Sequence, residues 1–273
     1  MHMKTFWQNK CVLVTGAGGF IGSHLVECLV DQGAHVWAFI RYNSKGEVGH
    51  LSALGSEAFS KLDIIAGDLR DLSAVTSAMN DVHTVFHLGA LIAIPYSASK
   101  FGADKLAESF YRAYDLPVVT VRPFVTYGPR QSTRAVIPTI ITQALTQDVI
   151  YLGNLDATRD LTYVSDTVEG FLCAGEAPEI EGRTFNLGVG CEVKIGDLAN
   201  QIISFIGRKV EIQVDSSRLR PAKSEVERLL SDNRLAKVKL NWSPRVNLQD
   251  GLLETIAWIS DHISSYQPSM YQL

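Results

Sequence analysis

Residues 15–22, TGAGGFIG, join an apolar run at residues 11–15 to a segment with helical periodicity, and this stretch decides the fold. A strand that passes through clustered glycines into a helix is typical of a loop that holds the pyrophosphate of a dinucleotide. Gly16 permits a tight turn, Gly19 lets the backbone approach the phosphates, and Gly22 allows helix and strand to pack closely. The free N–H groups at the start of the helix favour an anion there. Because many glycine-rich turns bind nothing, a purely structural turn is the alternative.

Outward from this loop, short apolar runs alternate with segments of helical periodicity. This order predicts an α/β fold: a Rossmann-type, doubly wound parallel sheet with helices on both faces, followed by a smaller C-terminal region. The expected strands cover residues 11–15, 35–40, 62–66, 81–88, 118–121 and 183–187. The expected helices cover residues 23–33, 72–80, 97–114, 135–148, 165–176, 196–206 and 248–264. The helix over 97–114 is amphipathic, with apolar residues at helical spacing that include Leu106 and Phe110.

Composition and charge exclude several classes of function. The 273 residues are 46% hydrophobic and 20% charged, and the net charge is −4, so no basic field attracts nucleic acid or an anionic membrane surface. No apolar run approaches the roughly 18 residues of a membrane span, and no signal peptide is recognised. The four cysteines form no CxxC pair, so we expect no metal site and reduced thiols in a cytoplasmic protein.

The residues that follow the second and third strands bear on the choice of dinucleotide. An acid at the end of the second strand would bind the ribose 2′-hydroxyl of NAD, whereas an arginine accommodates the 2′-phosphate of NADP. Arg41 stands there and favours NADP, with a solvated loop arginine as the alternative. Asp68, after the third strand, is placed to reach the adenine ring. Its alternative role is that of an acid at a helix N-terminus, as for Asp71.

Tyr96 and Lys100 are four residues apart, which places them on one face of the helix expected over 97–114. An ammonium near a phenol favours the phenolate and lowers the pKa of the tyrosine. Such a tyrosine can act as a general base on a hydroxyl while a hydride passes to a nicotinamide. Because a Tyr/Lys pair at this spacing often arises by accident, the glycine loop upstream is what gives it weight.

The order of five segments resembles one family over nearly the whole chain. The segments are TGAGGFIGSHL, HLGA, YSASKFGADKLAESF, RPFVTYGPR and RDLTYVSDTVEGF, and SEVERLLSD at 224–232 is similar to the family's tail. They resemble the NAD(P)-dependent nucleotide-sugar epimerases and 4,6-dehydratases, a branch of the extended short-chain dehydrogenases/reductases. The resemblance implies a bound NAD or NADP, a UDP-, dTDP- or GDP-linked hexose as substrate, and transient hydride transfer at C4 of the sugar.

The resemblance also implies a role for individual residues. Tyr96 and Lys100 would be catalytic. Residues 1–124 would form the cofactor-binding domain, and 125–273 would be mainly a substrate-binding region, partly interleaved with the sheet. The residues that would contact the cofactor are Gly16, Gly19, Phe20, Ile21, Gly22, Arg41, Asp68, Leu69, Leu88, Ala90, Lys100 and Pro123.

Three arginines are candidates for the nucleotide-sugar site by the same likeness. They are Arg130, Arg159 and Arg220, and a guanidinium can bind a phosphate through two parallel hydrogen bonds. For Arg130 and Arg220 the alternative is ordinary surface charge. Arg159 is the stronger candidate, because Asp160 and the apolar run after it are expected to hold it in place.

The chain departs from the family pattern at two places. Residues 94–97 join HLGA directly to the YxxxK helix, so roughly 60 residues, about one helix–strand unit with its loops, are absent. The absent strand supplies the family's Ser/Thr that hydrogen-bonds the substrate hydroxyl, and the absent helix belongs to the usual dimer face. A homodimer is therefore an open question. Val125 stands where relatives often carry an asparagine, and valine cannot make that hydrogen bond.

These departures leave two functions open. The leading interpretation is an NAD(P)-dependent nucleotide-sugar dehydratase or epimerase, with a likeness to 4,6-dehydratases of N-acetylhexosamine nucleotides. The rival is a catalytically impaired protein of the same fold that binds the cofactor or a nucleotide sugar. The absent Ser/Thr strand and Val125 favour the rival.

Overall fold

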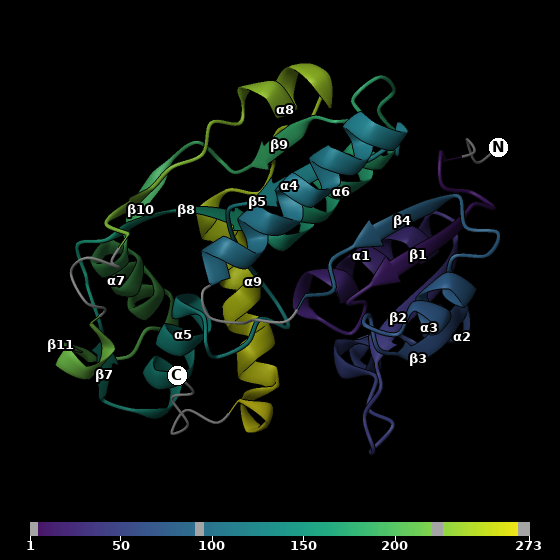
Figure 1. Ribbon diagram of the computed structural model, residues 1–273. Coiled ribbons are helices and arrows are strands. Elements are labelled where there is room, and N and C mark those ends of the chain that lie inside the picture. The colour runs from purple at the N-terminus through teal and green to yellow at the C-terminus, as the bar shows by residue number, and fades with distance from the viewer. Residues whose placement is uncertain (1–4, 91–95, 220–225, 267–273) are drawn as a thin grey trace. The chain divides into compact units, whose positions relative to one another are not determined.

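The computed structural model describes residues 5–90, 96–219 and 226–266, and the side chain of Tyr96 lies outside this description. Contacts between residues divide the chain into two compact units. Unit 1 consists of residues 1–120 and 171–183, and unit 2 consists of residues 121–170 and 184–273. Each unit has its own strands, all parallel in unit 1 and mixed in unit 2 (Figure 1).

Unit 1 is a parallel sheet of strand order β3-β2-β1-β4. Its strands are β1 (Cys11–Thr15), β2 (His35–Arg41), β3 (Leu62–Gly67) and β4 (Thr84–His87). Its helices are α1 (Phe20–Asp31), α2 (Ser56–Ser60), α3 (Leu72–Ala78) and α4 (Tyr96–Tyr114), with a 3₁₀ turn η1 (Gly49–Ala53), and α6 (Val164–Glu176) ends in this unit.

The core of unit 1 forms because β1 and β2 are apolar on both faces. Val12, Val14 and Val36 are fully buried, as are Leu25 and Leu29 on the inner face of α1. Buried strands of this kind are typical of parallel sheets covered by helices. Parallel order and strand–helix alternation confirm the predicted α/β, Rossmann-type fold, and β3-β2-β1-β4 is the first part of the Rossmann strand order.

Helix α4 differs from the expectation for an amphipathic helix, because none of its described side chains is buried. Leu106 is 61% exposed and Phe110 is 43% exposed, although both lie on its apolar face. Glu108 forms ion pairs with Lys105 and Arg112, so the opposite face carries charge as expected. The helix therefore has an apolar face without a partner in the described part of the chain.

The fifth strand begins two residues later than predicted and pairs differently. β5 (Thr120–Pro123) pairs with β9 (Thr184–Leu187) in a separate two-stranded sheet, and Phe124 N–H donates to the Leu187 carbonyl at 2.8 Å. β4 pairs with β1 alone among the described strands. Within the described residues, β4 is therefore an edge strand of the unit 1 sheet.

Unit 2 is built around β8 (Thr158–Tyr163), which pairs with three short strands. They are β6 (Val125–Tyr127), β10 (Glu192–Lys194) and β12 (Arg228–Leu229). A second pair consists of β7 (Val149–Leu152) and β11 (Glu211–Val214). The helices are α5 (Val136–Thr146), α7 (Ile195–Ile206), α8 (Arg234–Lys239) and α9 (Leu248–Asp261), with 3₁₀ turns η2 (Ser216–Arg218) and η3 (Ile263–Ser265).

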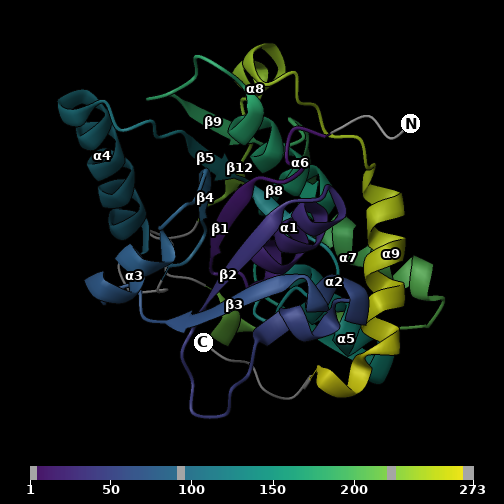
Figure 2. The ribbon, with the colours of Figure 1, turned by 90° about the vertical axis from the view of Figure 1, so that its right-hand side faces the viewer.

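The core of unit 2 lies between its helices and strands. Ile140 on α5, Leu198 on α7 and Leu252 on α9 are fully buried, as is Ile150 on β7. Figure 2 shows α9 as a long helix that runs past α5. Within the described residues, no helix combines the length and the apolar character that crossing a bilayer requires.

Candidate functional site

A cavity of about 490 Å³ opens in unit 1 at the carboxyl ends of the parallel strands. Ligands of open α/β sheets bind at this edge. The glycine turn after β1, the ends of β2 and β3, and the residues after β4 all contribute to its wall. The lining residues are Gly16, Gly18, Gly19, Phe39, Ile40, Arg41, Asn43, Glu47, Val48, Gly49, Gly67, Asp68, Leu69, Arg70, Leu88, Gly89 and Ala90.

The glycine turn has the geometry that its sequence predicts. Gly16 has a φ of +71°, and a Cβ there would lie 2.8 Å from the Gly89 nitrogen. A Cβ on Gly22 would lie 2.2 Å from the Gly16 carbonyl oxygen, so α1 packs directly against the turn. Gly19 precedes α1 as its N-cap and has no side-chain cap, so the first N–H groups of the helix remain available to an anion.

The loop after β2 covers this turn from the other side. A Cβ on Gly18 would lie 2.7 Å from the Val48 carbonyl oxygen, and His50 N–H donates to the Gly18 carbonyl at 2.9 Å. The Asn43 side chain folds the loop: it donates to the Glu47 carbonyl at 2.7 Å and accepts from the Glu47 N–H at 2.9 Å. The cavity is therefore bounded by backbone that is held in one conformation.

Polar contacts fix the strand end at β4. The Thr15 hydroxyl contacts His87 Nδ1 at 2.8 Å and accepts a hydrogen bond from the Gly89 N–H at 3.1 Å. Burial, with a smaller contribution from the charge of Lys100, lowers the pKa of His87, so the imidazole is neutral at pH 7. His87 thus orients the segment that brings Leu88 and Ala90 to the cavity.

The acidic and basic residues at the ends of β2 and β3 face the same cavity. Arg70 holds the Asp68 carboxylate through Nη2 at 2.6 Å and Nε at 3.0 Å, and the Arg70 N–H adds a third hydrogen bond at 2.9 Å. These hydrogen bonds keep the pKa of Asp68 far below its usual range. Arg41 is the last residue of β2 and also lines the cavity.

The structure gathers most, though not all, of the predicted cofactor residues. The residues that line the cavity are Gly16, Gly19, Arg41, Asp68, Leu69, Leu88 and Ala90. Phe20, Ile21 and Gly22 form the first turn of α1 behind it. Lys100 is an exposed residue of α4, and Tyr96 is the first residue of that helix. Pro123 ends β5 and belongs to unit 2.

Other lining residues were missed because the sequence does not reveal which loops fold back on the glycine turn. Asn43, Val48 and Gly49 enter the wall through a loop that has no glycine-loop motif. Arg70 is two residues after Asp68, and this spacing is the one sequence signal that would have suggested it.

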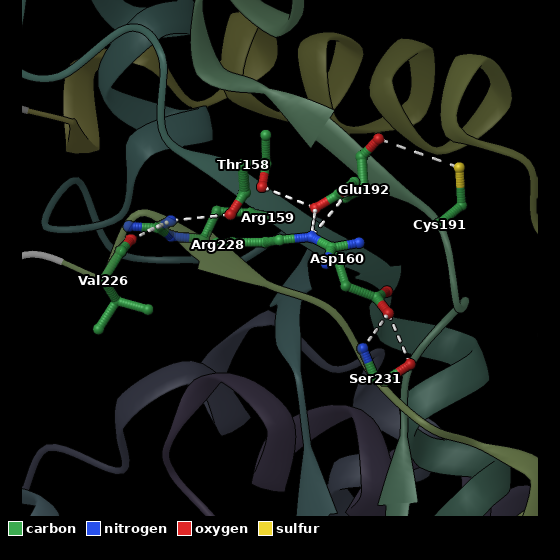
Figure 3. A network of polar contacts seen from close by, with 8 residues as sticks. All are labelled: Thr158, Arg159, Asp160, Cys191, Glu192, Val226, Arg228 and Ser231. Atoms are coloured by element: carbon green, nitrogen blue, oxygen red, sulfur yellow. Dashed lines mark hydrogen bonds and ion pairs between the residues drawn. The ribbon is translucent and has the colours of Figure 1, made fainter.

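In unit 2, Arg159 is held by main-chain carbonyls. Its Nη1 donates to the carbonyl oxygens of Thr158 and Val226, each at 2.8 Å (Figure 3). The expectation that Asp160 holds Arg159 is wrong. Successive side chains of a strand point to opposite faces, so the carboxylate of Asp160 lies on the other side of β8.

Asp160 instead ties three parts of unit 2 together. It is fully buried and accepts the N–H groups of Val189 at 2.8 Å, Gly190 at 2.9 Å and Ser231 at 3.0 Å, together with the Ser231 hydroxyl (Figure 3). Glu192, which is paired with Asp160 across β10 and β8, accepts hydrogen bonds from Thr158 and Arg228. These contacts fix the strands on both sides of Arg159.

Two further arginines were candidates for the nucleotide-sugar site. Arg130 is only 6% exposed, so its alternative reading as surface charge is wrong; it has a φ of +68°, and its guanidinium lies 5.8 Å from the Trp258 ring centroid. Arg220 lies outside the described residues. Val125 is the first residue of β6, where its backbone pairs with Leu161 of β8.

The sequence is similar to known proteins over most of its length. The sequence model of the GDP-mannose 4,6 dehydratase family matches residues 13–95 and 93–255. A trifunctional UDP-glucose 4,6-dehydratase/UDP-4-keto-6-deoxy-D-glucose 3,5-epimerase/UDP-4-keto-L-rhamnose-reductase of Arabidopsis thaliana is 32% identical over 169 residues, which cover 62% of this chain. Those residues span 25% of that longer protein.

Two other comparisons extend over most of the chain. A UDP-glucose 4-epimerase of Mycolicibacterium smegmatis is 27% identical to this chain. The alignment covers 89% of this chain and 96% of the epimerase. The crystal structure of a dTDP-glucose 4,6-dehydratase from Bacillus anthracis in complex with NAD superimposes with a TM-score of 0.84. That likeness covers 95% of this chain and 99% of the other at 20% identity, and it supports the fold alone.

The comparisons also locate an internal difference in length. The alignment with the Mycolicibacterium epimerase runs over 311 positions, whereas the whole chain has 273 residues. The two matches to the family's sequence model meet at residues 93–95. Chain and relatives therefore differ by a segment at the junction between β4 and α4, where the sequence predicts the loss. With matches on both sides of that junction, the chain belongs to the GDP-mannose 4,6 dehydratase family.

Proposed function

We propose that the chain is an NAD(P)-dependent enzyme that acts on a nucleotide-linked hexose, as a 4,6-dehydratase or a 4-epimerase. The cavity at the carboxyl ends of the unit 1 strands is the observation that carries the proposal. Any side chain at Gly16 or Gly18 would collide with backbone, so the wall is shaped for close approach of a ligand to the main chain. A dinucleotide pyrophosphate fits such a cradle.

The chain's own residues supply a coherent set of binding roles. The N–H groups at the start of α1 would bind the pyrophosphate, while Leu69 and Phe39 would offer apolar surface to the adenine. A bound nicotinamide would accept a hydride from the sugar and return it. Dehydration and epimerisation would both begin with this hydride transfer. The chain resembles a relative with 4,6-dehydratase activity and a relative that is a 4-epimerase.

Proton handling is assigned to Tyr96 and Lys100. The phenolate of Tyr96 would take the proton of a sugar hydroxyl as a general base. The Lys100 ammonium would favour that phenolate, because an opposite charge nearby stabilises the ionised form. Both residues belong to one turn of α4, and this helical spacing supports the pairing.

Substrate binding is assigned to unit 2. Arg159 and Arg220 are the proposed phosphate-binding residues, and the fixed position of Arg159 between two carbonyls supports the first of them. Arg130 is the weaker candidate, because a buried guanidinium offers few N–H groups to a ligand. We further propose a cytoplasmic enzyme, with residues 1–124 for the cofactor and 125–273 mainly for the substrate.

The test is product analysis on UDP-, dTDP- and GDP-linked hexoses by NMR, with purified protein and added NAD or NADP. We expect either a 4-keto-6-deoxy product or a C4 epimer. Tyr96→Phe should lower turnover by about 10²–10⁴-fold, the usual range for loss of a general base. Tyr114→Phe, an exposed tyrosine at the other end of α4, is the matched control. Equal turnover by Tyr96→Phe and the unmodified protein would contradict the assignment.

A second candidate function is cofactor or nucleotide-sugar binding without catalysis. It is favoured by the interrupted match to the family at residues 93–95 and by the absence of buried side chains along the described part of α4. Both observations concern the helix that carries Tyr96 and Lys100. Binding of a dinucleotide without turnover of any of the three classes of nucleotide sugar would favour this second function.

A further inference from the structure

His87, the last residue of β4, is held at only one of its two ring nitrogens. It pairs in register with Thr15 of β1, and its Nδ1 lies 2.8 Å from the Thr15 hydroxyl oxygen. Thr15 is 4% exposed, whereas His87 is an exposed residue. Among the described residues, the other ring nitrogen, Nε2, has no hydrogen-bond partner. The imidazole is therefore anchored at Nδ1 and available to a ligand at Nε2.

The hydrogen bonds of Thr15 determine which ring nitrogen carries the proton. The Gly89 N–H donates to the Thr15 hydroxyl oxygen at 3.1 Å, so this oxygen already accepts one hydrogen bond. A hydroxyl has a single hydrogen to donate, and the acceptor that the described structure offers to it is His87 Nδ1. A buried hydroxyl hydrogen without an acceptor is costly, so Nδ1 accepts. The proton of the neutral ring is then on Nε2, which is a donor.

His87 is close to both parts of the machinery assigned above. Leu88, Gly89 and Ala90 follow it directly and line the cavity, whereas His87 itself does not. The Lys100 ammonium is near enough to act on the ring: desolvation, and after it the charge of Lys100, lowers the pKa of His87. Among the described strands β4 pairs with β1 alone, so no strand covers the other side of His87. The Nε2–H donor thus lies beside the cofactor cavity and near the proposed catalytic lysine.

A second histidine of the same sheet shows what a purely structural role looks like. His83 precedes β4, and its Nδ1 accepts the Cys11 N–H at 3.1 Å, which joins the chain before β4 to the start of β1. That contact lies at the amino ends of the strands. His87 makes a similar link between β1 and β4 at the carboxyl ends, where ligands of open α/β sheets bind. Its position therefore calls for more than a link between strands.

The proposed reaction needs a hydrogen-bond donor of this kind. When a hydride leaves C4 of the sugar and the hydroxyl proton passes to Tyr96, the oxygen at C4 carries negative charge until the carbonyl is complete. A fixed N–H donor stabilises such an oxygen in the transition state. Because the His87 ring is neutral, it offers a donor without placing a second cation beside Lys100.

We propose that the Nε2–H of His87 donates a hydrogen bond to the oxygen at C4 of the nucleotide-linked hexose, as a third catalytic residue beside Tyr96 and Lys100. Thr15 is the positioning residue that fixes the orientation and the tautomer of the ring. The inference rests on the proposed function, because it concerns the same reaction. It goes further by assigning a substrate contact to a residue outside the cavity wall.

The first test measures kcat of the full chain at saturating dinucleotide and nucleotide sugar, so that weaker cofactor binding cannot lower the rate. His87→Ala should lower kcat by about 10²–10³-fold, the usual loss for one donor to a developing oxyanion. His87→Gln keeps an N–H donor and should recover part of this loss. His83→Gln is the matched control, because it removes a histidine of the same sheet at the opposite ends of the strands, and it should leave kcat unchanged.

The second test observes the ring directly by nitrogen NMR of protein labelled at histidine. Without ligand, the couplings of His87 should show its proton on Nε2. UDP-, dTDP- and GDP-linked glucose are then added in turn together with NADH or NADPH, which cannot accept a hydride. The sugar that binds should shift the Nε2–H resonance of His87 and leave the resonances of His83 in place. A role confined to joining β1 and β4 would give no response to the sugar.

The outcomes separate this inference from the proposed function. A proton on Nδ1, or a His87 resonance that does not move when a sugar binds, would overturn the inference. Full kcat in His87→Ala would also overturn it and leave the proposed function standing. Binding of neither a dinucleotide nor a nucleotide sugar by protein with an intact circular dichroism spectrum would overturn the proposed function itself, and the inference with it.

Discussion

At the scale of single residues, the glycines of the turn after β1 do two different things. Gly16 supplies a positive φ and also lies against Gly89, whereas Gly22 provides room for α1 beside the turn. The sequence predicted both roles, because spacing along one loop fixes them. It could not predict that Gly18 lies against the Val48 carbonyl, since that contact depends on how a distant loop folds back.

Gly16→Ala is expected to destabilise the fold by more than about 1 kcal/mol, because alanine there combines an unfavourable φ with a collision against backbone. The free energy of unfolding of both proteins is measured by urea denaturation. Gly102→Ala is the matched control: this helical glycine has nothing within 4 Å of a Cβ, so its substitution should stabilise by about 0.5–1 kcal/mol. A Gly16→Ala protein as stable as the original would show that the turn adopts another conformation.

At the scale of elements, unit 2 depends on one buried carboxylate. Asp160 in β8 binds the segment at Val189 and Gly190 and the residue Ser231 that follows β12. The sequence placed Asp160 beside Arg159 and so suggested a pair. Strand alternation separates the two side chains, and the pairing partners of β8 are strands of two or three residues, too short for periodicity to reveal.

Asp160→Asn should lower the free energy of unfolding by at least about 1.5–3 kcal/mol, the loss for a hydrogen bond to a charged group. The asparagine amide would place an NH₂ donor where the N–H groups of Val189, Gly190 and Ser231 now meet carboxylate oxygens. Asp156→Asn is the control, because its carboxylate is 89% exposed and its ion pair with Lys194 should matter by less than about 0.5 kcal/mol. Similar denaturation midpoints for the two variants would argue against a central role for Asp160.

At the scale of the whole molecule, the sequence predicted the parallel, Rossmann-type sheet of unit 1, because short apolar runs there alternate with segments of helical periodicity. It also located the internal loss, since motifs on both sides of residues 94–97 are intact. What it could not predict is the consequence for α4. An amphipathic pattern indicates that a helix has an apolar face. Whether another element covers that face depends on the tertiary fold.

Replacing Leu106 and Phe110 of α4 together with glutamine should change the free energy of unfolding by less than about 0.5 kcal/mol per site, because both side chains are exposed. The same pair of changes should reduce binding of the dye ANS, which reports exposed apolar surface. Leu198→Gln, at a fully buried position, is the contrasting variant and should destabilise strongly. A loss of more than about 1 kcal/mol per site in the α4 variant would mean that another surface covers this face.

We propose that a dinucleotide binds the unit 1 cavity, with its pyrophosphate at the glycine turn. Amide hydrogen exchange of the full chain, measured with and without saturating NADPH, tests it most directly. We expect slower exchange in the segments that contain residues 16–22, 40–49, 67–70 and 88–90, and little change in β7, β11 and α7 of unit 2. Protection confined to unit 2, or none around the glycine turn at saturating NADPH, would contradict it.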